Sequence, residues 1–386
     1  MQRARWFAFS LAVLLLVTVA FQLQAGQMKG TPSRGRYGVL APMSSGNLTI
    51  FPVVADSQAD TRMFITLDEG LRSGEVVVTE AGNVQPLIRR RPVRSQQSSA
   101  QVNTLMLVNN SKKPLLLLAG EIVTGGKQDR VIGKDRIVPA ESDPIDLGVF
   151  CVEPGRWVAQ TDRFNIFGGL AAPNVRKNAM AKKDQQQVWD AVRDSNAKTA
   201  ENLAYSARVA GAPPPSPQVL SELRSTSSYA RVMENKSVQQ QVDKLAEPIQ
   251  RSYQALIKDL RAKNAVGVVV AVNGQMLWAD IFASTDLLEK YWPKLIRSYV
   301  AEAMTQGGSG GKVLQSEAQA FVDRLDGTHE NADTEPGVYR QAEITGSNYK
   351  VFELTSLLPK TDFTVHVAKM HDEEIALNKR PVPFVR

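Results

Sequence analysis

The chain has 386 residues, 43% apolar and 22% charged, the proportions of an ordinary globular protein with room for two or three compact units. Its one cysteine, Cys151, excludes a disulfide within the chain. The net charge of +7 becomes +5 without Arg3 and Arg5, and the one dense basic cluster (residues 89–91 with Arg94) has no interleaved aromatics, so composition does not favour a nucleic-acid-binding protein.

The first 25 residues have the three parts of a secretory signal. Arg3 and Arg5 form a positive end, residues 6–20 are almost wholly apolar, and small residues follow near Ala25. The apolar run is shorter than the roughly 20 residues of a spanning helix. We therefore predict a signal peptide at 1–25 and an exported protein, periplasmic or extracellular. Whether the segment is cleaved or retained as an anchor stays open.

A polar lead-in at 26–36 precedes a β-rich domain at 37–175. Short runs of Val, Ile, Leu and Thr alternate there with Gly, Asn, Pro and Ser, which is typical of strands and turns. The predicted strands are 48–54, 63–67, 75–80, 84–88, 105–109, 115–118, 122–123, 130–132, 136–138 and 147–152. This pattern predicts an antiparallel β-sandwich or barrel.

A helical segment follows at 176–263. Residues 184–210 favour one helix, and the proline-rich run at 212–217 breaks it because proline fixes φ and lacks an N–H donor. A second helix presents one apolar face at steps of three and four residues, with Pro248 expected to kink or divide it. The face comprises Val238, Val242, Leu245, Ile249, Tyr253, Leu256 and Leu260. Core packing is the favoured role, and partner binding is the alternative.

Residues 264–370 predict a small α/β unit. Asn273-Gly274 joins two apolar runs in a hairpin with a type I′ turn, and Asp286 with Glu289 is the expected cap of the next helix. The glycine run at 307–311 is expected to be a flexible connector. A short helix at 316–325, closing strands at 337–344, 349–354 and 363–368, and a polar tail at 371–386 complete an α+β fold.

Chemical motifs are sparse. His329, His366 and His371 lack the spacing of a zinc site, and no nucleophile or phosphate-loop motif occurs, so we predict no metal and no cofactor. His366 alternates with two valines and is expected to face away from the core. Cys151 lies in an apolar run and is expected to be buried and inert, with a reactive thiol as the alternative.

Two polar stretches follow buried strands and form the candidate site. Glu121 leaves the most apolar strand, where Arg130, Gln128 or Lys127 is the expected partner. Cys151 is followed by Glu153, Arg156 and Trp157. Such sets can line one pocket, where an arginine fork matches an anion. An internal salt-bridge network that closes the end of the sandwich is the favoured interpretation, and a ligand site is the alternative. The candidate binding residues are Glu121, Gln128, Arg130, Glu153, Arg156 and Trp157.

The same stretches resemble a known family. LLLLAGE at 115–121, GGKQDR at 125–130, Val138-Pro139 and CVEPGRW at 151–157 look like the ARG and Rhodanese-Phosphatase-superfamily-associated protein domain. ADIF at 279–282 and WPKL at 292–295 are similar to its second half. The resemblance spans residues 38–370 and implies no established activity, because the family's name reflects genomic association.

Three functions remain open at this point. The first is an exported, non-catalytic binding or structural protein of the cell envelope, with a small anionic ligand or an envelope protein as partner. The second is a hydrolase-like enzyme that uses Glu121 or Glu153 as general acid/base, which requires both in one open cleft. The third is an envelope assembly factor that docks through its helical middle.

Overall fold

The computed structural model describes residues 36–80, 104–156, 161, 163–308 and 310–372. Contacts divide the chain into Met1–Arg34 and Gly35–Arg386, and the description concerns the second unit. The predicted signal peptide, most of the lead-in and the tail, the strand at 84–88, the basic cluster and Trp157 lie outside the described residues.

The described residues form strands and helices in α+β order. The strands are β1 (Tyr37–Val39), β2 (Met43–Ser45), β3 (Leu48–Ala55), β4 (Ile65–Thr66), β5 (Val76–Glu80), β6 (Thr104–Asn109), β7 (Leu115–Leu117), β8 (Glu121–Thr124), β9 (Arg130–Ile132), β10 (Arg136–Val138), β11 (Ile145–Cys151), β12 (Asn165–Leu170), β13 (Ala265–Val272), β14 (Gln275–Phe282), β15 (Thr328–Glu335), β16 (Tyr339–Thr345), β17 (Tyr349–Ser356) and β18 (Phe363–His371). The helices are α2 (Leu67–Ser73), α3 (Pro173–Lys177), the π-helix η3 (Asn178–Lys182), α4 (Gln185–Val209), α5 (Pro217–Ser225), α6 (Tyr229–Glu234), α7 (Lys236–Ala262), α8 (Thr285–Gln306) and α9 (Gln315–Asp323).

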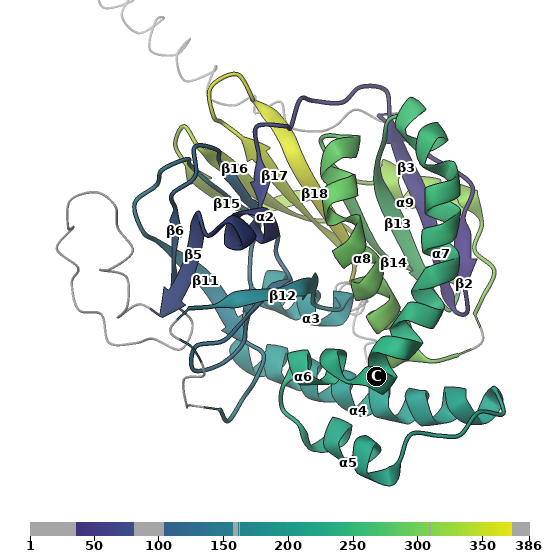
Figure 1. Cartoon of the computed structure of the whole chain (residues 1–386). Coiled ribbons are helices and arrows are strands. Elements are labelled where there is room, and N and C mark those ends of the chain that lie inside the picture. The colour runs from purple at the N-terminus through teal and green to yellow at the C-terminus, as the bar shows by residue number, and fades with distance from the viewer. Residues whose placement is uncertain (1–35, 81–103, 157–160, 162, 309, 373–386) are drawn as a thin grey trace, which may run out of the picture. The chain divides into compact units, whose positions relative to one another are not determined.

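A nine-stranded antiparallel sheet joins the two ends of the described chain. Its order is β1-β3-β13-β14-β18-β17-β16-β15, and β2 pairs with β3. In Figure 1 the purple β3 lies beside the green β13, with Val269 of β13 opposite Phe51 of β3. All eight residues of β13 are buried, as expected for a central strand covered on both faces. The 37–175 and 264–370 segments therefore share one sheet.

Helices cover both faces of this sheet. Apolar side chains of α7 and α8 share a core with Ile50, Val268 and Val270 on one face. On the other face, Ala318 and Val322 of α9 pack against Phe51, Val53 and Val269. Figure 1 shows α7 and α8 crossing in front of the strands.

Two smaller sheets enclose a separate core. One has the order β10-β7-β4, and the other β12-β8-β9-β11-β6-β5. Leu115 and Leu117 of the first sheet pack with Leu105, Leu107 and Val149 of the second. The predicted α+β class, with antiparallel sheets and a helical middle, is confirmed.

Predictions that rest on a pattern within one short stretch of sequence agree with the structure. The hairpin has its turn at Asn273 and Gly274, both at positive φ, and the helix predicted at 184–210 is α4. α7 buries most of the predicted face, although Leu256 is 43% exposed, and it continues through Pro248.

Three local predictions need correction. α8 is capped by Ser284, whose hydroxyl accepts from Leu287 N at 3.1 Å, so Asp286 lies in the first turn. The polar strand β15 and the glycine-containing β12 were not predicted, because neither has an apolar run. The glycine run packs closely, since a Cβ on Gly308 would lie 2.3 Å from Asn273 Oδ1.

Candidate functional site

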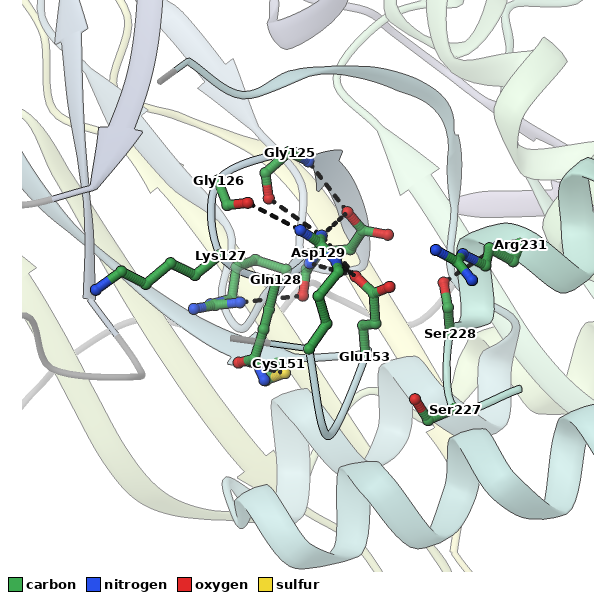
Figure 2. A network of polar contacts seen from close by, with 12 residues as sticks. Gly125, Gly126, Lys127, Gln128, Asp129, Cys151, Glu153, Ser227, Ser228 and Arg231 are labelled. Carbon is green, nitrogen blue, oxygen red and sulfur yellow. Dashed lines mark hydrogen bonds and ion pairs between the residues drawn. The ribbon is translucent and has the colours of Figure 1, made fainter. Parts of the chain in front are cut away.

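The loop after β8 binds the chain's own carboxylates. Gly125 and Gly126 have φ of 125° and 49°, a backbone region that favours glycine. Gly125 N donates to Asp129 Oδ1 at 3.1 Å, and Lys127 N donates to Glu80 Oε1 at 3.0 Å. Figure 2 shows Asp129 and Glu153 converging below this loop while Lys127 extends away. A loop of N–H groups can hold an external anion, and here internal acids accept these two donors.

Arg156 ties this loop to the segment after β11. Its Nε donates to Glu153 Oε2 at 2.6 Å, its Nη1 to Gly126 O at 2.9 Å, and its Nη2 to Asp129 Oδ1 at 3.2 Å. Only 13% of its side chain is exposed. The predicted internal salt-bridge network therefore describes this geometry better than an open anion site.

Asp129 is an acid of this network with a pKa close to neutral pH. Burial raises the pKa of Asp129 to about 6, against the opposing hydrogen bond from Gly125, and Glu153 adds to the rise. A partly protonated Asp129 reduces the repulsion between two neighbouring carboxyl groups.

Gln128, Arg130 and Cys151 form the buried floor of the loop. Cys151 Sγ donates to Gln128 Oε1 at 2.9 Å, and burial raises the pKa of this thiol. Arg130 is 2% exposed, and its Nη1 lies 3.4 Å from Asp129 O. The expectation of a buried Cys151 is confirmed. A raised pKa keeps the thiol protonated and therefore weakly nucleophilic.

Glu121 belongs to a different network. Its Oε1 accepts from Lys294 Nζ at 2.5 Å, and Lys294 also lies 2.8 Å from Asp68 Oδ1. Leu118 N donates to the other oxygen at 2.9 Å, and burial raises the pKa of Glu121 while Lys294 opposes the rise. The expected partners Arg130, Gln128 and Lys127 were wrong, because α8 brings a buried lysine over the strand end.

A third polar network is one that the sequence did not reveal. Arg176 of α3 makes a two-pronged ion pair with Asp280 of β14, both contacts at 2.9 Å and both side chains fully buried. Tyr299 donates to the same carboxylate. Gly120, at φ 96°, is needed here because a Cβ would lie 2.5 Å from the Arg176 side chain.

His366 extends this network to a third segment. Its Nδ1 lies 2.6 Å from Asp135 Oδ2, and its Nε2 lies 3.2 Å from Asp280 Oδ1. The residue is fully buried, so the expectation that it faces away from the core was wrong. Burial opposes the charged ring, but the two aspartates outweigh burial and raise the pKa of His366 to about 9.

A cavity of about 320 Å³, here called the α3–α8 pocket, is a further candidate that the sequence did not indicate. Its lining comprises Pro173, Asn174, Lys177, Val272, Gln275, Met276, Leu277, Trp278, Glu302, Gln306, Met370 and His371. Glu302 of α8 is 4% exposed, and burial raises the pKa of its carboxyl. Its oxygens accept from Asn174 N at 2.9 Å and Gln306 Nε2 at 3.0 Å. No basic side chain pairs with it among the described residues.

Metal-binding clusters and membrane spans are both absent from the described part of the chain. No group of three or more His, Cys, Asp or Glu side chains in that part is arranged to hold a metal ion. None of its helices is both long and apolar enough to cross a membrane.

Fold and sites together define an α+β protein whose buried acids are mostly paired and which has a cavity walled by α3, α8 and the β13–β14 hairpin. The chain matches the model of the ARG and Rhodanese-Phosphatase-superfamily-associated Protein domain over residues 36–370, and it belongs to that family. No curated protein and no solved structure matches it.

Proposed function

We propose that this chain is an exported, non-catalytic binding protein that holds a small polar ligand in the α3–α8 pocket. One observation carries the proposal: Glu302 is a buried carboxylate at the wall of a cavity, without a basic partner among the described residues. Burying an unpaired charge costs free energy. A ligand that satisfies Glu302 recovers that cost on binding.

The geometry of the other acids supports binding over catalysis. A hydrolase of the predicted kind needs Glu121 and Glu153 in one open cleft. Instead Glu121 pairs with Lys294, and Glu153 pairs with Arg156, and both carboxylates are buried. A general acid or base must reach the substrate proton within about 3 Å. These paired side chains give that alternative no direct support.

The proposal that this chain is exported rests on its amino-terminal sequence alone. The positive end, the apolar run at residues 6–20 and the small residues near Ala25 favour secretion. Expression of the full chain in a bacterial host, followed by separation of periplasm and cytoplasm, tests this part. Replacement of Leu14, Leu15 and Leu16 by Asp should retain the chain in the cytoplasm. Equal distribution of both forms would contradict export.

A thermal-shift screen tests binding directly. The purified chain is melted with a mixed library of small polar metabolites, and at least one compound should raise the midpoint in a saturable way. Gln275→Trp places a large side chain at the exposed rim of the pocket and should abolish the shift. Lys258→Trp, at an exposed position on α7 away from the pocket, is the matched control and should retain it. A library without any Gln275→Trp-sensitive binder would contradict the proposed function.

A further inference from the structure

We infer that the ligand of the α3–α8 pocket is a small organic cation, an aliphatic amine whose ammonium group hydrogen-bonds to Glu302. The inference rests on the proposed binding function and adds the chemical class of the ligand. It predicts a ligand charge opposite to the anion expected from the strand-end arginines.

The first step is a comparison among buried acids. Eight carboxylates are buried among the described residues, and seven of them face a Lys, Arg or His nitrogen within 3.2 Å. The seven are Glu121, Asp129, Asp135, Glu153, Asp280, Glu343 and Asp372. Glu302 is the eighth. The fold thus pairs its buried acids with bases throughout the described residues, and the one exception lies at a cavity.

The second step concerns the capacity of Glu302 to bind more. Its two hydrogen bonds, from Asn174 N and Gln306 Nε2, come from neutral donors. Lys198 acts on Glu302 only from beyond ion-pair distance and is itself paired with Asp194, so no basic group contacts the carboxylate. A carboxylate has about four acceptor positions, which leaves about two for a ligand. An ammonium group supplies three donors and the missing charge together. Hydrogen bonds between charged groups are about twice as strong as neutral ones.

The third step concerns the rest of the wall. Of the two basic residues in the lining, Lys177 is paired with Asp372 at 3.0 Å, which offsets its charge, and the other is His371. Met276, Leu277, Trp278 and Met370 provide apolar surface for an alkyl chain. A volume of about 320 Å³ is at the lower end of the usual range for ligand pockets, about 300–1,000 Å³, so the amine is small.

Calorimetry of the full chain with three matched probes tests the inference. The probes are n-pentylamine, 1-pentanol and hexanoate, which share a chain of similar length and differ in the charge of the head group. The amine should bind with a measurable heat, at least tenfold more tightly than the alcohol, while hexanoate should not bind. Affinity for the amine should fall as the pH is lowered through the raised pKa of Glu302, because protonation removes the negative charge.

Two variants separate a binding role of Glu302 from a merely structural one. Glu302→Gln retains a side chain of the same size and should weaken amine binding at least tenfold. It should leave the melting temperature of the free protein equal or higher, because an uncompensated buried charge is removed. Glu201→Gln removes an exposed charge on α4 and should change neither quantity. A lower melting temperature together with unchanged amine affinity would assign Glu302 only to holding α3.

The outcomes distinguish this inference from the proposed function. One outcome is that hexanoate or pentanol binds the wild type but not Gln275→Trp, while the amine does not bind. In that case the inference of a cationic ligand is wrong, and the proposed binding function stands. The same holds if the amine binds Glu302→Gln as tightly as the wild type. If neither the probes nor the metabolite library binds, the proposed function itself is wrong.

Discussion

At the scale of single residues, charge balance explains why a histidine is buried between two aspartates. The charged groups at this point are Asp135 and Asp280 on either side of His366, and Arg176 on the far side of Asp280. Two negative charges then face one guanidinium. A protonated His366 brings the set to neutrality, which is why its pKa rises although burial alone would lower it.

This protonation predicts how stability depends on pH. The pKa of His366 is about 9 in the folded chain, against roughly 6.5 in the unfolded chain, so the folded state binds more protons between these values. The stabilisation is complete below about pH 6.5 and is lost as the pH rises through about 9, an effect of about 3 kcal/mol. Urea unfolding at pH 6 and 9.5 measures it. His366→Gln should have a lower free energy of unfolding than the wild type at pH 6 and should lose most of the wild-type decrease between pH 6 and 9.5. Equal decreases in the two proteins would contradict the assignment of this pH dependence to His366.

Lys369 should act in the opposite direction. Burial, with a contribution from Arg324, lowers the pKa of Lys369 to about 7, while its Nζ donates to the backbone oxygens of Phe321 and Arg324. The unfolded chain then binds more protons between about pH 7 and 10.4, so this residue contributes stability that grows with pH. Lys369→Met should therefore steepen the decline that His366 causes. An unchanged decline in this variant would show that Lys369 stays charged in the fold.

The pair of Lys294 and Glu121 predicts a large asymmetry between single and double variants. Lys294→Met leaves Glu121 charged, buried and without its base, which should cost about 3–5 kcal/mol of unfolding free energy. The double variant Lys294→Met/Glu121→Gln removes both charges and should recover most of that loss. Equilibrium urea unfolding of both proteins checks the difference. Equal losses in the two would mean that the ion pair itself, rather than the uncompensated charge, carries the effect.

At the scale of elements, the glycine run after α8 is a packed junction. Asn273 Nδ2 donates to Gly307 O at 2.8 Å, and Gly308 stands against Asn273 at φ 95°. Asn47 Nδ2 also donates to Gly307 O. The carbonyl oxygens of Ala303 and Gly307 at the end of α8 thus accept hydrogen bonds from asparagines of two turns, which fixes the helix end on the sheet.

Gly308→Ala tests this junction. A side chain at positive φ costs about 1–3 kcal/mol, and the close contact with Asn273 adds to it. Gly211→Ala is the matched control, since Gly211 has φ 64° but a Cβ added there would meet no atom within 4 Å. Thermal unfolding should show the larger loss for Gly308→Ala. Equal losses of stability in the two variants would mean that backbone strain alone causes the loss and that Asn273 moves away from the added side chain.

How much of the fold and of the candidate site the sequence predicts depends on how far apart the interacting residues lie along the chain. The β13–β14 hairpin and α7 were predictable because their signals lie within one stretch of chain. The partners of His366 and Glu121 were not, since Asp135 and Lys294 lie 231 and 173 positions away from them. No sequence pattern pointed to Glu302. It differs from the other buried acids by having no basic side chain in contact with it, and only a structure can show that.

At the scale of the whole described unit, the first strands depend on the last ones. β3 contributes Ile50 and Phe51 to the cores on opposite faces of the large sheet, and its neighbour β13 comes more than 200 residues later. Arg176 and Asp135 also join segments before residue 177 to β14 and β18. Residues 264–370 therefore lack both an edge partner and their buried countercharges when they stand alone.

A split chain tests this dependence. Residues 176–386 expressed alone should not unfold cooperatively, because β13 would expose an unpaired apolar edge that favours aggregation. Mixing them with residues 26–175 should restore a single transition. In the intact chain, Phe51→Ala should cost about 3–5 kcal/mol and shift the tryptophan fluorescence and circular dichroism transitions together. Cooperative unfolding of residues 176–386 by themselves would show that the large sheet closes without β3, and that the ion pair of His366 with Asp135 is not needed to hold it.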